Sequence, residues 1–135
     1  MIRKILLLFL IIPLILLCGF KKAERPFLIL SAGTITAESV QRIERAFTVG
    51  QRVNYALVSP DGLKYSGVRM QLSTQSDKTT NYGYSLIETN DLYIDKYSKM
   101  YRDYFVPRKA GKYILQFFYL YKKNYPFAHI EFVVR

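Results

Sequence analysis

The single histidine is the residue to consider first for catalysis or metal binding. His129 lies in an alternating segment near the C-terminus, and Glu131, two residues later, falls on the same face of a strand. A metal site would need further histidine, cysteine or carboxylate ligands, and no other segment supplies them at a matching spacing. We therefore interpret His129 and Glu131 as a surface pair that holds no metal.

The carboxylates do not form the close pair that general acid and base catalysis needs. Glu88, Asp91, Asp95 and Asp103 are scattered through the second half of the chain. The sequence also lacks a glycine-rich phosphate loop, a nucleophile elbow and a cysteine–histidine pairing. The chain is therefore predicted not to be an enzyme and to need no cofactor.

Basic residues are the most abundant charged groups. The chain has 20 Lys and Arg against 10 Asp and Glu, and this formal net charge of +10 favours polyanionic partners. One basic set is interleaved with Tyr and Phe and is the candidate contact for a partner or a polyanion: Lys96, Lys99, Arg102, Arg108, Lys109, Lys122 and Lys123. A solvated face explains most of these charges, and an anionic envelope polymer or lipid is the functional alternative.

The N-terminal residues have the pattern of a secretory leader. A short cationic start over residues 1–4 precedes an apolar run over 5–20 that only Pro13 interrupts. The run is short for a membrane-spanning helix, which needs ~20 residues, and typical of the apolar region of a leader. We therefore expect the protein to be exported, and nucleic acid is not an expected partner.

Cys18, the only cysteine, stands at the end of this run. The stretch Ile15-Leu16-Leu17-Cys18-Gly19 resembles the leader of a bacterial lipoprotein, in which an aliphatic residue lies three positions before a lipid-modified cysteine. Ile15 and Cys18 match that pattern, whereas Leu17 stands where Gly, Ala or Ser is usual. The resemblance implies cleavage before Cys18 and its acylation, which would anchor the protein in a membrane. The alternative is an uncleaved signal anchor in which Cys18 is one more apolar residue.

Both forms of the N-terminus keep the folded part close to a membrane. We expect a leader at residues 1–18, a tether at 19–26 and one domain at 27–135. The extended tether would span at most ~28 Å. Three basic residues of the tether would lie among lipid headgroups: Lys21, Lys22 and Arg25.

The remaining residues predict an all-β domain. Half of the chain is hydrophobic and 16% is aromatic, which is enough for one core without disulfides. A type I turn is predicted at residues 59–62, which read SPDG. Apolar runs and period-two alternation predict strands on both sides of this turn and at both ends of the domain: residues 27–30, 53–57, 68–72 and 127–134.

Three segments have weaker patterns. Residues 37–47 fit a helix or an edge strand, and we prefer the strand. Residues 73–81 are almost wholly polar and predict a surface loop. We place a hairpin turn at 88–91, followed by a strand that ends near Val106, with a one-turn helix at 93–99 as the alternative.

The longest strand pattern lies within residues 106–121. A turn over 107–111 precedes a strand over 112–121 whose two faces are both apolar. We therefore expect the central strand of a β-sandwich, covered on both sides. If the second face is not covered by the chain itself, it is a candidate apolar contact for a partner: Ile114, Phe118 and Leu120.

Residues 110–115, reading AGKYIL, resemble the tyrosine corner of immunoglobulin-like sandwiches, in which a tyrosine lies two residues before a buried core position. Tyr113 would be the corner residue, Leu115 would replace the second cysteine of those domains, and Leu57 or Tyr55 would replace the first. The resemblance implies an immunoglobulin-like antiparallel β-sandwich preceded by a hydrophobic signal or anchor helix. The chain lacks both cysteines and the core tryptophan, so no specific family is indicated.

These patterns predict a membrane-anchored lipoprotein of the bacterial cell envelope, whose small β-sandwich is a non-catalytic binding or structural module. Its partners would be the membrane and an envelope protein or anionic polymer. The alternative is a polyanion-binding domain, for an anionic polymer or a lipid surface, held by an uncleaved signal anchor. Both hypotheses place the domain on the periplasmic or cell-surface side of a membrane.

Overall fold

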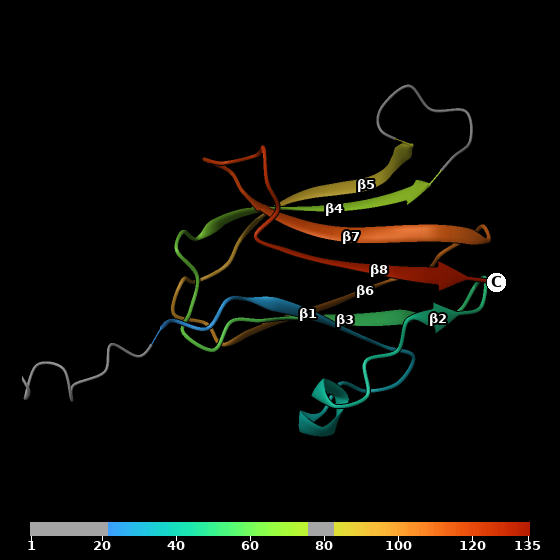
Figure 1. Ribbon diagram of the computed structural model, residues 1–135, viewed down its shortest axis with the longest axis horizontal. Helices are drawn as coiled ribbons and strands as arrows, with labels where there is room; N and C mark the ends of the chain where they lie inside the picture. Colours follow the sequence, from blue (N-terminus) through green and yellow to red (C-terminus); the bar gives the residue numbers. More distant parts are fainter. Residues whose placement is uncertain (1–21, 76–82) are drawn as a thin grey trace, which may run out of the picture.

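The computed structural model describes residues 22–75 and 83–135, which form two β-sheets packed face to face (Figure 1). The first sheet has the strand order β1-β3-β6, with β1 at Phe27–Ser31, β3 at Val53–Val58 and β6 at Met100–Phe105. The second has the order β2-β8-β7-β4-β5, with β2 at Ala46–Phe47, β4 at Gly67–Gln75, β5 at Tyr84–Tyr93, β7 at Gly111–Tyr119 and β8 at Ala128–Val134. The expected all-β sandwich is confirmed.

The predicted leader, Cys18 and the first part of the predicted tether lie outside the described residues. Over 22–75 and 83–135, no helix is both long enough and apolar enough to cross a membrane.

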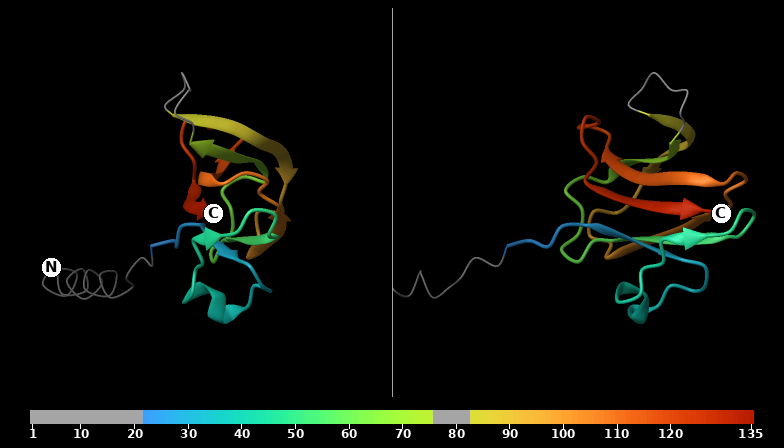
Figure 2. Two further views of the ribbon diagram at one scale, coloured as in Figure 1. Left: turned by 90° about the vertical axis from the view of Figure 1, so that its right-hand side faces the viewer. Right: turned by 45° about the vertical axis from the view of Figure 1, so that its right-hand side comes forward.

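The ribbon views show the two sheets as facing layers (Figure 2). Side chains at alternating positions of both sheets form the core between them. In β3, Val53, Tyr55 and Leu57 are fully buried, as their period-two spacing predicts. The ring centroid of Tyr55 lies 6.1 Å from that of Phe105 in its own sheet and 6.0 Å from that of Phe117 in the other sheet. Tyr55 therefore joins the two layers through aromatic contacts.

Strand β7 is central in its sheet, as predicted. It pairs antiparallel with β4 on one side and with β8 on the other. Leu115 and Phe117 of its inward face are fully buried, and Ile114 and Phe118 of its other face each keep only 7% of their surface exposed. The strand is therefore covered on both faces by the chain itself.

The connection over 106–110 carries the chain from the first sheet to the second, and Tyr113 closes it. Tyr113 Oη donates a 2.6 Å hydrogen bond to the backbone carbonyl of Lys109, and its ring stacks on that of Phe132 at a centroid distance of 5.3 Å. Burial raises the pKa of the Tyr113 hydroxyl above its ordinary value. The hydrogen bond from the tyrosine to the backbone upstream is the contact that a tyrosine corner makes.

The predicted turn at 59–62 is present and links the two sheets. The Gly62 amide donates a 3.0 Å hydrogen bond to the Ser59 carbonyl. Gly62 has φ of +78°, a conformation that glycine adopts at little cost. Because β3 and β4 belong to different sheets, this turn is a crossing between layers and not a hairpin.

The prediction of a strand over 37–47 is wrong for most of that segment. Ala37–Val40 form a short 3-10 helix, η1, and only the two residues of β2 extend, pairing parallel with the end of β8. The Thr36 amide donates to Ser39 Oγ at 2.9 Å, and the Ser39 amide donates to the Thr36 carbonyl at 3.0 Å. These short-range bonds give the backbone an alternative to a strand ladder.

The prediction of a hairpin at 88–91 is also wrong, because these residues lie inside β5. Arg69 of β4 faces Asp91 across the ladder, and Arg69 Nε lies 2.6 Å from Asp91 Oδ1. Hydrogen bonding from Arg69 lowers the pKa of Asp91 below its ordinary range. As an edge strand, β5 leaves its polar side chains in water, so its residues need not alternate in the way a half-buried strand does.

The chain turns at 94–99 instead. Asp95 Oδ1 accepts a 2.8 Å hydrogen bond from the Tyr97 amide, and the Asp95 carbonyl accepts one of 2.9 Å from Ser98. The segment is thus a turn and not the alternative helix. The end of β6 at Phe105 agrees with the predicted strand end near Val106.

The expected polar loop over 73–81 begins later than predicted. Residues 73–75 continue β4, and Ser73 is 7% exposed because it lies beside Ile114 of β7. The remainder of that predicted loop lies outside the described residues.

Candidate anion-binding site

A hollow of about 640 Å³ lies on the outer face of the first sheet. Its walls come from the loop after β1, the residues at the start of β3 and the end of β6. Within the β3–β6 ladder, Asn54 pairs with Tyr104 and Ala56 pairs with Arg102. Because alternate side chains of a strand share one face, these residues point to the same side as Arg52. We name this feature, with its residues Gly33, Arg52, Asn54, Arg102 and Tyr104, the arginine hollow.

Two contacts hold Arg52 at the edge of the arginine hollow, and a third holds its partner Asn54. Its guanidinium carbon lies 3.8 Å from the centroid of the Tyr104 ring, in a cation–π contact. Arg52 Nε donates a 3.0 Å hydrogen bond to Asn54 Oδ1, while Asn54 Nδ2 donates one of 2.9 Å to the Gly33 carbonyl. A guanidinium has five N–H donors, so the bond to Asn54 leaves most of them to face a ligand.

Arg102 supplies the second guanidinium of the arginine hollow. Its Nε donates a 2.9 Å hydrogen bond to the sulfur of Met100, on the same outward face of β6. Asp103 also borders the hollow, but its side chain lies on the other face of β6 and accepts a 3.4 Å hydrogen bond from Tyr101 Oη. Two planar cations that border one hollow suit a carboxylate or a phosphate group.

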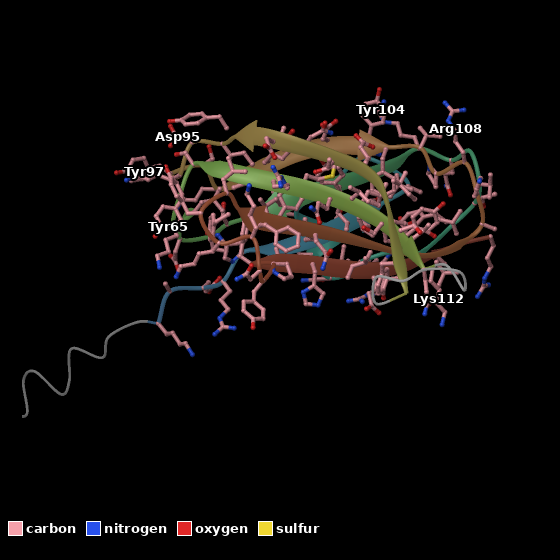
Figure 3. The ribbon with its side chains drawn as sticks, turned by 90° about the horizontal axis from the view of Figure 1, so that it is seen from above. Tyr65, Asp95, Tyr97, Tyr104, Arg108 and Lys112 are labelled. Atoms are coloured by element: carbon pink, nitrogen blue, oxygen red, sulfur yellow. The ribbon has the colours of Figure 1, made fainter. Side chains whose placement is uncertain are left out.

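The structure divides the predicted basic set among three places. Arg102 lines the arginine hollow, while Arg108 and Lys109 lie on the connection between β6 and β7 at one end of the sandwich. Figure 3 shows Arg108 at that end and Tyr97 at the opposite end, where the chain enters from the tether. The other four residues of the set belong to loops at the tether end: Lys96, Lys99, Lys122 and Lys123.

The loops at the tether end are bonded to one another. The Leu63 amide donates a 2.7 Å hydrogen bond to the Lys96 carbonyl, and the Lys64 amide donates one of 3.0 Å to Tyr119 Oη. The Tyr65 ring lies 5.5 Å from that of Tyr121, measured between centroids. We name this region, formed by residues 22–26, 59–66, 93–99 and 119–127, the tether-end surface.

The apolar candidates of the central strand offer little surface to a partner. Ile114 and Phe118 are each 7% exposed, and Leu120, just past the end of β7, is half-buried. Leu120 also packs against Gly67, where a Cβ atom would lie 3.0 Å from its Cδ1. These three residues therefore serve the packing of the described chain.

His129 and Glu131 lie on one face of the last strand, at the surface, as the alternation in the sequence predicts. His129 and Glu131 are both exposed, on the outward face of β8. Among the residues that the structure describes, no cluster of three or more His, Cys, Asp or Glu side chains could hold a metal ion.

Sequence reasoning missed most of the arginine hollow. Only Arg102 belongs to the predicted basic set, and Arg52, Asn54 and Tyr104 were not candidates. These residues come together through the pairing of β3 with β6, in which Asn54 faces Tyr104, 50 positions later in the chain. Short-range spacing carries no signal of that pairing, and only a correct prediction of strand neighbours would have found the site.

No family model and no curated protein sequence matches this chain. Among solved structures, it is similar to a superoxide reductase (neelaredoxin) from Ignicoccus hospitalis, with 8% identity, a TM-score of 0.45, and coverage of 84% of this chain and 82% of that one. It is also similar to a Niemann-Pick type C2 protein from Japanese carpenter ant, with 11% identity, a TM-score of 0.47, and coverage of 87% and 94%. A β-glucosidase from Kluyveromyces marxianus gives 12% identity and a TM-score of 0.42, and the match covers 87% of this chain but 15% of the enzyme. Similarity at this level transfers no activity, ligand or site.

Proposed function

We propose that this protein is a membrane-anchored component of the bacterial cell envelope, whose immunoglobulin-like sandwich binds an anionic group of an envelope polymer or protein and catalyses no reaction. The observation that carries the binding proposal is that Arg52 and Arg102 both line one hollow of about 640 Å³. A guanidinium pair recognises carboxylate and phosphate groups by charge and by directed hydrogen bonds. The net charge of +10 would draw such a ligand towards the domain.

Two features support the immunoglobulin-like type of sandwich. The first is the division of neighbouring strands between the sheets, with β1 beside β3 in one sheet and β2 parallel to β8 in the other. The second is the hydrogen bond from Tyr113 to the Lys109 carbonyl, at a connection that crosses between the sheets.

The lipid anchor is proposed from the leader sequence and Cys18. We expect Cys18→Ala to lose the mass of the attached lipid, because the acylated sulfur is absent. The variant should also leave the membrane fraction on carbonate washing. Mass spectrometry and fractionation check both effects. An unchanged mass with retained membrane binding would favour the uncleaved signal anchor.

Substitution of both arginines of the hollow should weaken binding to an anionic polymer. We expect the double variant Arg52→Gln, Arg102→Gln to bind polyphosphate or polygalacturonate about 10-fold or more weakly, because two charge-assisted hydrogen-bonding groups are lost. Isothermal titration of the full chain with each polymer measures the effect. The two probes separate phosphate from carboxylate recognition.

The matched control is Arg108→Gln, Lys109→Gln, which removes the same charge from a loop outside the hollow. Its affinity should stay within about threefold of the parent, as exposed charges at a distance are screened by salt. Equal losses in the two double variants would mean that diffuse charge, and not the arginine hollow, binds the polymer.

A further inference from the structure

We propose that the tether-end surface lies on an anionic lipid bilayer, with its tyrosines and lysines in the headgroup layer. The orientation rests on the proposed membrane anchor, whereas the contact itself is a separate property of the folded domain. The occupant is thus a phospholipid surface and not a protein.

The course of the chain brings this surface to the membrane. The Glu24 amide donates a 2.5 Å hydrogen bond to Asp61 Oδ2, so the tether is fixed to the connection between β3 and β4. Six residues separate Glu24 from Cys18 and would span at most about 22 Å. From Phe20, the end of the apolar run, the span is at most about 14 Å. An anchor at either point keeps this end of the sandwich within that distance of the bilayer and makes it the end nearest to the lipid.

The most exposed large apolar side chains of the described residues gather at this end. They are four tyrosines, with exposed fractions of 85% for Tyr93, 75% for Tyr97, 81% for Tyr121 and 83% for Tyr125. The next value elsewhere is 56%, for Leu86 on β5. Tyrosine has an apolar ring and a polar hydroxyl, and it is enriched where a membrane meets water.

The charge of the tether-end surface matches anionic headgroups. Basic side chains outnumber acidic ones, and two of the acids already accept hydrogen bonds from backbone amides, Asp61 from Glu24 and Asp95 from Tyr97. Lysines beside exposed rings can bury their carbon chains at the interface and keep the ammonium among phosphates. The seven basic residues are Lys22, Arg25, Lys64, Lys96, Lys99, Lys122 and Lys123, and the three acidic ones are Glu24, Asp61 and Asp95.

The surface is preorganised, which lowers the ordering cost of docking. The Ser59 amide donates a 2.8 Å hydrogen bond to the Lys99 carbonyl, and Lys99 Nζ donates one of 2.6 Å to the Pro60 carbonyl. The Tyr65 ring packs edge-on against that of Tyr119 at 5.4 Å. The loops from three connections therefore present one fixed face towards the bilayer.

The absence of tryptophan from the sequence allows a single-reporter test. Full-length Tyr125→Trp is reconstituted with pure phosphatidylcholine vesicles and with vesicles that also contain phosphatidylglycerol. With the anionic vesicles we expect a blue shift of the tryptophan emission and strong quenching by brominated lipid. The matched control is Val106→Trp at the opposite end of the sandwich, where neither effect is expected.

Charge reversal tests the electrostatic part of the contact. Placed in the Tyr125→Trp background, Lys122→Glu with Lys123→Glu should abolish the blue shift on anionic vesicles. Arg108→Glu with Lys109→Glu should leave it unchanged. Equal losses in the two variants would overturn the assignment to the tether-end surface.

Flotation of the same samples separates this proposal from the proposed anchor. Flotation with both vesicle types, with quenching at Tyr125→Trp on the anionic ones, supports both proposals. Flotation with both vesicle types but without quenching overturns the proposed docking of the tether-end surface and still supports the proposed anchor. Flotation with anionic vesicles alone, with quenching and release by salt, supports the docking and overturns the anchor. No flotation with either overturns both.

Discussion

Gly62→Ala should lower the free energy of unfolding by about 3 kcal/mol, through strain and a steric clash at one turn. Gly62 has φ of +78°, where a residue with a Cβ atom is disfavoured. A Cβ atom there would also meet the backbone oxygen of Lys96 in severe overlap. That oxygen accepts the 2.7 Å hydrogen bond from the Leu63 amide, so the backbone at this point cannot withdraw without breaking a bond. Urea denaturation of the full chain measures the loss.

Gly50→Ala is the matched control for the clash. Gly50 has φ of +81°, nearly the same as Gly62, but a Cβ atom there would meet no other atom within 4 Å. Its expected loss is therefore the conformational strain alone, about 1 kcal/mol. Similar losses for the two variants would show that the approach of Gly62 to Lys96 adds nothing to the cost.

Tyr113→Phe should lower the free energy of unfolding by about 1–2 kcal/mol. The change removes the 2.6 Å hydrogen bond from Tyr113 Oη to the Lys109 carbonyl and leaves that acceptor without its partner. The aromatic ring and its stacking on Phe132 are retained. Thermal and urea denaturation measure the change, and binding to anionic polymers should be unaffected. Normal stability with lost binding would show that Tyr113 contributes to binding and not to the stability of the fold.

Tyr55→Phe is the matched control, with the opposite expected sign. The Tyr55 hydroxyl is buried and has no hydrogen-bond partner among the described residues. Its removal relieves the cost of a buried polar group, so stability should stay equal or rise. Burial, with a smaller contribution from the nearby Tyr101 and Asp103, raises the pKa of Tyr55 far above its ordinary value of 10.0.

The raised pKa gives a second readout for Tyr55. Below pH 10.0 the Tyr55 hydroxyl is neutral in both the folded and the unfolded chain, so its ionisation does not change the free energy of unfolding and the stability is at its full value. The free energy of unfolding falls as the pH rises above that value, because the Tyr55 hydroxyl then ionises freely only in the unfolded chain. The Tyr55→Phe variant should therefore lose less stability at alkaline pH than the parent. An equal loss in both would assign the effect to other tyrosines.

The sequence predicts strands well where one face of a strand is buried. Val53, Tyr55 and Leu57 alternate with less apolar residues, and burial of one face makes that period visible. Strand β5 lies at a sheet edge, and its residues 88–91 contain Asn and Asp, which are common in turns. Its extended form follows from pairing with β4, including the Arg69–Asp91 contact, and this tertiary pairing overrides the local preference.

The candidate site was less predictable than the fold. Arg102 could be chosen from its charge, but its partnership with Arg52 depends on the register of β3 against β6. Tyr113 could be identified from a stretch of only six residues, because its hydrogen bond reaches the Lys109 carbonyl just four positions earlier. Contacts between residues close in the sequence can therefore be predicted from it, whereas contacts that depend on the order of strands in a sheet cannot.

The course of β1 determines how the domain carries a mechanical load. The predicted tether joins β1 at one end of the sandwich, and the last residue lies at the other (Figure 1). A pull on the tether therefore acts along the axis of β1, which is bonded to β3 from Phe27 opposite Val58 to Ser31 opposite Asn54. Ladder hydrogen bonds run across the strands, so such a force shears them together and does not open them one at a time. An anchor attached at this point would resist tension better than one attached at the other end of the same strand.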